Sequence, residues 1–470
     1  MSREGKSTQK RQCKITGPVE GGIHGWPFAG YFGNIGKYDY VEEEYFIEGD
    51  AVHYTEVGEL TLDGKWELKE REPGGYKTRI LVRRPLNAER FNGTVIVEWA
   101  NVSFGYDISL CDTTDLYENG YAYVLVSAQP TGLNGYAVNP SGLIKWDGER
   151  YGNLFIPDDG ICYDIFTQAA RAIGPERSLS EIDPMAELPV KRLIAVGASQ
   201  SGMRIQSYAN GVHPLEPVFD GFIPIVNAGG VADFSDELGH PDPTLGNHGH
   251  SRHLFSGIRD DLDVPVIVLN TTTEGEVLSR HPQPDTDKVR SWQIAGASHI
   301  GTKQWQQLLQ KSDRDGISDS LNRYSTTQTD HVIWLPTFAA AVMQLQTWIT
   351  SGRKAKTYPS LQVENGTYVC DEYGNVKGGI RLPDLEVPIA RYIAGMAMPL
   401  GGYTISFSSE QLRELYPSND SYVQKITESA LRAFEEGVIL KSRLDEYINM
   451  AKAAPVPKPA MPDLTPVIRK

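Results

Sequence analysis

The chain has 470 residues, 40% of them hydrophobic and 22% charged, which is typical of a soluble globular protein large enough for an α/β domain with insertions. Its net charge of −15 argues against a nucleic-acid partner, because phosphate binding needs a basic surface. The polar N-terminus lacks a secretory signal, and no apolar run is long enough to span a bilayer. We therefore expect a cytoplasmic protein with no membrane segment. The cysteines are scattered and contain no CxxC pair, which argues against a zinc site or a disulfide framework: Cys13, Cys111, Cys162 and Cys370.

The first part of the chain predicts a surface segment followed by antiparallel strands. Residues 1–36 are rich in Gly and Pro and are expected to lie on the surface. Strand-like patterns follow between residues 38 and 82, and one of them alternates polar and apolar residues as a half-solvated antiparallel strand does. They read EEYFIEGDAVHY, GELTLDGKWELKE and YKTRILVRRP.

From residue 93 onward, the pattern changes to continuous apolar runs, which are typical of parallel strands buried on both faces. These runs read TVIVEWANV, YAYVLVSAQ, RLIAVGAS, VPVIVLNTT and VRSWQIAG. Helical patterns lie at 163–174, directly after residue 200, and at 337–350. Alternating strands and helices predict an α/β fold with a mostly parallel, doubly wound sheet.

Two further segments complete the predicted organisation. The α/β core spans 37–352, and within it the loop-like insertion 229–262 occupies the place of a lid or pocket wall. The C-terminal extension 353–470 is rich in turns and ends in amphipathic helices, so we expect it to pack on the core.

The segment RLIAVGASQSGMRIQ indicates a nucleophile on a sharp turn between a strand and a helix. Ser199 fits that position, because Gly197 and Ser201 are small enough to stand two residues away on each side. Ser201 is a rival nucleophile, but its frame would put Met203 where a small residue is needed. A serine that only caps a helix is the structural alternative.

Two backbone N–H groups are expected to form an oxyanion hole. The N–H of Gln200 follows the nucleophile and lies at the positive end of the next helix. The second donor is expected in the loop after the strand TVIVEW, from Asn101 or Val102. An ordinary loop between a strand and a helix is the alternative.

Position along the chain selects the catalytic base and acid. In α/β enzymes with a serine nucleophile on such a turn, the histidine comes in the loop after the last strand. His299 lies in the short turn after VRSWQIAG. The acid comes a few residues after a late strand, which favours Glu274, whereas a longer turn would favour Glu276. The acid would orient the imidazole and stabilise its cation.

The remaining candidate residues concern the substrate pocket and bound groups. Trp99, Phe104 and Tyr106 are candidates for a moderately apolar pocket, although aromatic residues at these positions also suit the core. No dinucleotide fingerprint is present, so no cofactor is expected. The spacing of one histidine cluster fits no metal-binding pair, and we expect no metal there: His248, His250 and His253.

Several segments resemble the alpha/beta hydrolase domain family, a branch of esterase-like hydrolases, over almost the whole chain. They read GTVIVEWANVSFG, GYAYVLVSAQ, RYGNLFIPDDGICYDIFTQAARAI, GASQSGMRIQSYANGVHPLEPVFDGF, RSWQIAGASHIG and DEYGNVKGGIRLPDLEVPIARY. The resemblance implies an α/β-hydrolase fold, a serine nucleophile at Ser199, a histidine at His299 and a C-terminal segment that belongs to the same domain. Where relatives carry Thr-Glu-Thr-Asp or Thr-Glu-Thr-Glu, this chain reads Thr-Thr-Thr-Glu-Gly-Glu. An ungapped match places the acid at Glu274, and a two-residue insertion places it at Glu276.

These features together predict a serine hydrolase that cleaves a small carboxylic ester or lactone through an acyl-enzyme. An acyltransferase would use the same acyl-enzyme, and a ligand-binding module could use the same scaffold. The sequence does not identify the natural substrate or the oligomeric state.

Overall fold

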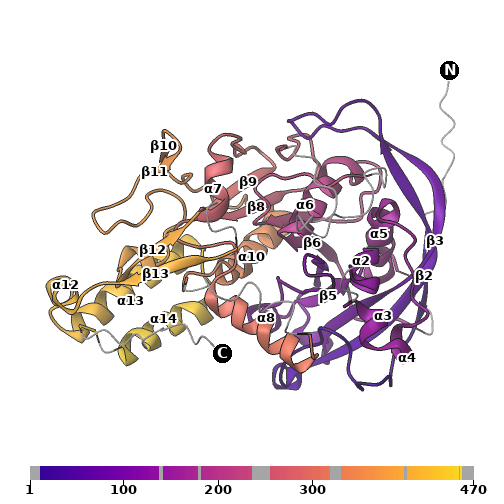
Figure 1. The fold of residues 1–470 in the computed structure, drawn as a ribbon, viewed down its shortest axis with the longest axis horizontal. Helices are drawn as coiled ribbons and strands as arrows, with labels where there is room; N and C mark the ends of the chain where they lie inside the picture. Colours follow the sequence, from indigo (N-terminus) through magenta and orange to yellow (C-terminus); the bar gives the residue numbers. More distant parts are fainter. Residues whose placement is uncertain are drawn as a thin grey trace.

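A computed structural model describes residues 11–136, 141–177, 182–234, 255–317, 330–395, 400–454 and 456–457. A nine-stranded sheet runs through it, in the order β1-β2-β3-β5-β4-β6-β7-β8-β9 (Figure 1). The six strands from β5 to β9 in this order are parallel. They are β4 (Thr94–Trp99), β5 (Ala122–Val126), β6 (Arg192–Ala198), β7 (Gly221–Ile225), β8 (Val266–Thr271) and β9 (Val289–Ile294).

The parallel strands confirm the predicted doubly wound sheet. Successive side chains of a strand point to opposite faces, and in β4 Val95 and Val97 enter one hydrophobic core while Ile96 enters the other. Helix α5 (Cys162–Ile173) contributes to the first core and α10 (Leu335–Ser351) to the second. β7 (Gly221–Ile225) is not predicted from the sequence, because Pro224 interrupts its apolar run and proline is unusual in a central strand.

The N-terminal strands are antiparallel, as expected. β2 (Tyr40–Glu56) and β3 (Leu68–Pro85) form a long hairpin, and β3 pairs antiparallel with β5. β1 (Lys14–Thr16) extends the edge of this hairpin. Because Phe28 is only 1% exposed, the segment expected on the surface also contributes to the core.

The C-terminal extension covers the opposite end of the sheet from the β2–β3 hairpin (Figure 1). Leu412, Ile426 and Leu444 of its helices enter the same core as Phe338 of α10. Its elements are β10 (Val363–Glu364), β11 (Thr367–Tyr368), α11 (Pro383–Glu386), β12 (Ala390–Ala394), β13 (Gly402–Ser406), α12 (Ser409–Leu415), α13 (Asn419–Glu436) and α14 (Lys441–Ala453).

The other α-helices connect the strands along the chain. They are α1 (Thr114–Glu118), α2 (Pro130–Asn134), α3 (Leu143–Trp146), α4 (Gly148–Tyr151), α6 (Gln200–Ser207), α7 (Thr272–Leu278) and α8 (Thr302–Arg314). No helix within the described ranges has the length and apolar character to cross a membrane. Most of the insertion predicted as a lid, residues 235–254, lies outside the described residues.

Candidate active site

Ser199 occupies a strained turn between β6 and α6. Its backbone φ of 61° and ψ of −123° are unfavourable for a residue with a side chain, and such strain is typical of a nucleophile held on an elbow. The turn leaves no room at Gly197 or Gly202, because an added Cβ would come within 2.6 Å of Ser201 O or Ile225 O, respectively. The strand, the tight turn and the small neighbours together hold Ser199 at the carboxyl end of β6.

Ser201 has a structural place in the same turn. Its Oγ accepts a hydrogen bond from the Ala198 N–H and lies 3.0 Å from Ala198 O, to which it donates. The side chain is fully buried. These two bonds close the elbow and engage the hydroxyl of the rival nucleophile.

The structure brings Ser199, His299 and Glu274 together in a line. His299 Nε2 lies 2.9 Å from Ser199 Oγ, and His299 Nδ1 lies 2.7 Å from Glu274 Oε1. His299 is 9% exposed and Glu274 is 2% exposed, so water has little access to the pair. The three side chains follow the carboxyl ends of three parallel strands, β6, β8 and β9, with β7 between the first two.

Glu274 is held as a carboxylate by several donors. Thr271 donates to Glu274 Oε2 through its backbone N–H at 2.9 Å and its hydroxyl at 2.5 Å, in a capping box at the start of α7. Burial alone would raise the pKa of Glu274, but the hydrogen bond and charge of His299, together with the Thr271 bonds, hold that pKa below its usual value. Glu274 can therefore stabilise an imidazolium.

Glu276, the alternative acid, faces another part of the molecule. It is half-buried, and its Oε1 lies 3.1 Å from the position of a Cβ added to Gly395 in the C-terminal extension. Of the two glutamates, Glu274 is the one whose carboxylate meets the imidazole.

A threonine, a tryptophan and an aspartate from other segments support the histidine loop. The backbone N–H of His299 donates to Thr273 Oγ1 at 3.0 Å, and Trp334 Nε1 donates to His299 O at 3.0 Å. Asp330 Oδ2 accepts the N–H of Ser298 at 2.7 Å. These supporting residues leave no local signal in the sequence. Thr271, three residues before Glu274, does form the pattern of a capping box, which could have identified the start of α7.

The predicted oxyanion donors differ in what they already bind. The N–H of Gln200 begins α6 and has no acceptor within the helix. The N–H of Asn101 donates to Ile108 O at 3.0 Å, so the structure does not leave it available to a substrate. The N–H of Val102 makes only a long contact, 3.3 Å, with Gln200 Oε1. Val102 is thus the better placed of the two candidates.

A buried polar network, which the sequence analysis does not identify, lies behind this loop. Gln200 Nε2 donates to Gln129 Oε1 at 2.7 Å, and Gln129 Nε2 lies 3.3 Å from both carboxylate oxygens of Asp159. Arg204 of α6 completes the network by binding Asp159 at 2.9 Å. The Asn101 side chain ties the same loop to the elbow by donating to Ala198 O at 2.9 Å. These bonds fix the relative positions of the elbow and the loop.

Two of the three candidate pocket aromatics lie in the hydrophobic core. Trp99 is fully buried against Phe166, with 4.9 Å between ring centroids, and its indole N–H donates to Gln129. Tyr106 is 2% exposed and meets Phe28 edge-on. Phe104 alone of the three is partly exposed, beside Trp305 of α8. Trp99 and Tyr106 thus pack in the core, although Tyr106 also lines a small cavity beside Phe28, and a role of either residue in a substrate pocket stays a prediction.

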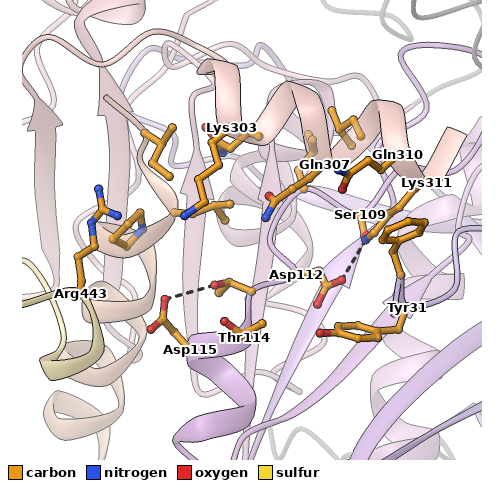
Figure 2. A pocket seen from close by; sticks show the side chains of 18 of the residues that line it. Tyr31, Ser109, Asp112, Thr114, Asp115, Lys303, Gln307, Gln310, Lys311 and Arg443 are labelled. Carbon is orange, nitrogen blue, oxygen red and sulfur yellow. Dashed lines mark hydrogen bonds and ion pairs between the residues drawn. The ribbon is translucent and has the colours of Figure 1, made fainter. Parts of the chain in front are cut away.

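A polar cavity of about 380 Å³ lies apart from these residues, between α8, α14 and the segment before α1 (Figure 2). Its charged side chains pair with one another, as Lys311 does with Asp112 at 3.0 Å and Lys303 with Glu446 at 3.1 Å. Neither Ser199 nor His299 lines it.

The described residues contain no group of three or more His, Cys, Asp or Glu that could hold a metal ion. The cluster of His248, His250 and His253 lies outside the described residues.

Several solved structures of esterases and related hydrolases are similar to the chain at low sequence identity. No curated protein sequence matches it significantly. Among solved structures, a ferulic acid esterase from Streptomyces cinnamoneus is 14% identical with a TM-score of 0.34, covering 65% of this chain and 91% of its own. A putative dienelactone hydrolase from Klebsiella pneumoniae is 15% identical with a TM-score of 0.27, covering 58% and 96%. A glucuronoyl esterase from Solibacter usitatus is 11% identical with a TM-score of 0.28, covering 66% and 88%.

The family comparison spans nearly the whole molecule. The family model described as "Alpha/beta hydrolase domain" matches residues 15–449. This range includes the elbow, the histidine loop and most of the C-terminal extension. The chain therefore belongs to the alpha/beta hydrolase domain family.

Proposed function

We propose that the protein hydrolyses a carboxylic ester or lactone of a small organic molecule, with Ser199 as nucleophile. The observation that carries this proposal is the line from Ser199 Oγ through the imidazole of His299 to the buried carboxylate of Glu274. A hydroxyl within 2.9 Å of an imidazole nitrogen, which is itself oriented by a carboxylate, is the arrangement that activates a serine.

In acylation, Ser199 Oγ attacks the carbonyl carbon while His299 Nε2 takes the hydroxyl proton. The tetrahedral intermediate then collapses, the bond to the leaving oxygen breaks, and His299 returns the proton to the departing alcohol. In deacylation, water attacks the acyl-enzyme with His299 again as base, and the carboxylic acid leaves. For a lactone, the alcohol and the acid are two ends of one product.

The developing oxyanion needs donors that do not have to reorganise. The N–H of Gln200 at the start of α6 supplies one, aided by the positive end of the helix dipole. The N–H of Val102 supplies the second once the carbonyl oxygen displaces its long contact with Gln200 Oε1. Gln200 Nε2 donates to Gln129 Oε1 at 2.7 Å, which ties the Gln200 side chain to the buried network behind the loop.

Transfer of the acyl group to an alcohol or amine is an alternative that uses the same acyl-enzyme. Binding without catalysis is a second alternative, and the strained backbone of Ser199 argues against it, because strain at a functional residue is retained where it serves a reaction.

The experiment is intact-mass analysis after incubation with a fluorophosphonate, on the native protein and on Ser199→Ala and Ser201→Ala. We expect one adduct on the native protein and on Ser201→Ala, and none on Ser199→Ala. An adduct on Ser199→Ala, or none on folded native protein, would overturn the proposal.

A further inference from the structure

The C-terminal extension reaches the helix that carries Glu274. Tyr368 lies on β11 of the small β10–β11 hairpin, and its hydroxyl donates to Thr272 O in the first turn of α7. Thr272 is separated from Glu274 by a single residue, so this bond holds the turn that presents the carboxylate. Tyr368 is 96 residues away from Thr272 in the chain, which makes the contact a tertiary one.

Gly275 provides the space for this contact. A Cβ added to Gly275 would lie 2.6 Å from Tyr368 Oη and 2.7 Å from Leu361 Cδ1, both from the C-terminal extension. Within a helix, glycine is less favourable than alanine by about 1 kcal/mol. Glycine at this position of α7 therefore costs helix stability and allows the tyrosine hydroxyl to reach the backbone.

The surroundings keep Tyr368 a hydrogen-bond donor. Burial raises the pKa of its phenol, and the neighbouring carboxylates of Glu276 and Glu274 raise it further. The hydroxyl therefore stays protonated throughout the pH range in which an esterase works.

The same extension supports the loop of the base. The N–H of Ile300, directly after His299, donates to Leu400 O at 3.0 Å. The first turn of α7 and the histidine loop are also joined to each other. Thr272 N–H donates to Ala297 O at 3.0 Å, and Thr272 Oγ1 accepts the N–H of Gly296 at 2.8 Å. A shift of the first turn of α7 would therefore move the acid relative to the imidazole.

We propose that Tyr368 is a positioning residue that fixes Glu274 against His299 by docking its hydroxyl on the first turn of α7. This inference rests on the proposed function, since it assigns Tyr368 to the same reaction. It predicts that losing one hydroxyl far from the nucleophile slows chemistry, because misplacement of a catalytic group by about 1 Å can cost on the order of a hundredfold in rate.

The test compares Tyr368→Phe with Tyr416→Phe. Tyr416 is a matched control, because its hydroxyl also donates to a backbone carbonyl within the extension, Pro388 O at 2.8 Å, and among the described residues no hydrogen bond links its side chain to α7 or to the histidine loop. We expect Tyr368→Phe to lower kcat and the fluorophosphonate labelling rate by about tenfold, with KM changed less than about twofold. The side chain of Tyr416 is more deeply buried than that of Tyr368, so Tyr416→Phe should lower Tm and leave both rates unchanged.

Gly275→Ala is a second variant that leaves the hydroxyl in the chain. The added methyl group displaces Tyr368, so we expect kcat to fall although alanine favours the helix. If Tyr368→Phe and Gly275→Ala both keep kcat within twofold of the native protein, the positioning role is overturned. If Tyr368→Phe fails to fold, Gly275→Ala alone decides. Absence of labelling on the native protein would contradict the proposed function itself, which is a separate outcome.

Discussion

The elbow and the acid–base pair are built in different ways. The elbow is held by contacts within a few residues, such as the paired bonds between Ser201 and Ala198. Glu274 lies in the first turn of α7 and His299 in the loop after β9, and both depend on distant segments, including Tyr368 and Trp334. The turn of the nucleophile is thus closed mainly by local bonds, with Asn101 tying it to a distant loop, while the acid and the base need tertiary contacts to meet each other. Mutations should therefore affect the two regions differently.

The largest effect is expected at the elbow itself. Ser199→Ala should lower kcat for any ester substrate by at least about a thousandfold, because the nucleophile is lost. Ser201→Ala should cost about 1–3 kcal/mol in free energy of unfolding through its two lost hydrogen bonds, and should keep most activity. Ester turnover and urea denaturation of both variants measure this. Comparable activity of the two alanine variants would show that the local assignment is wrong.

The next largest effect separates the two glutamates of α7. Glu274→Gln should lower kcat by about a hundredfold to ten-thousandfold, since a neutral amide cannot stabilise the imidazolium and can favour the wrong tautomer. Glu276→Gln, two residues away and half-buried, should change kcat less than about twofold. Steady-state kinetics on a chromogenic ester measure both. The reverse order of effects would move the acid to Glu276.

A smaller effect is expected from a threonine that supports the histidine loop. Thr273→Val removes the acceptor of the His299 N–H and leaves a buried donor unsatisfied, at a cost of about 1–3 kcal/mol in stability. We expect kcat to fall about tenfold because the imidazole loosens. Thr337→Val is the control, because its buried hydroxyl has no hydrogen-bond partner in the described part of the chain. Equal kcat values for the two variants would contradict the support that we assign to Thr273.

The smallest effect concerns two buried carboxylates, Glu274 of the site and Glu98 of β4, which accepts the N–H groups of Leu110 and Cys111. Burial raises the pKa of Glu98 to about 7, whereas that of Glu274 is lowered as described above. The contribution of Glu98 to stability is therefore present below its usual pKa and is lost as the pH rises through 7; that of Glu274 is present above its usual pKa and is lost in acid. As the pH rises from 5 to 8, the free energy of unfolding of Glu98→Gln should therefore increase relative to that of the native protein. Denaturation at both pH values checks this, and an unchanged difference between the two would contradict it.

The sequence predicts features that depend on neighbouring residues better than features that depend on distant contacts. The small residues around Ser199 indicate the elbow because steric limits act between neighbours in the chain. The parallel strands are predicted from their apolar runs, except β7, where Pro224 hides the pattern. Strand order places His299 and Glu274, yet their partner Tyr368 could not be predicted, because a contact 96 residues away leaves no local signal. Trp99 shows the same limit, since an aromatic residue at a strand end suits either a pocket or the core.

The central claim is that an acyl-enzyme forms on Ser199 and is released by water. The most direct measurement is rapid acid quench of the native protein with excess p-nitrophenyl ester, followed by intact mass and peptide mapping. We predict an acyl adduct on the peptide that contains Ser199, which disappears as the carboxylic acid accumulates. Turnover with no adduct on the native protein or on Glu274→Gln, or an adduct on another residue, would contradict the claim. An adduct that only an added alcohol or amine releases would show an acyltransferase instead.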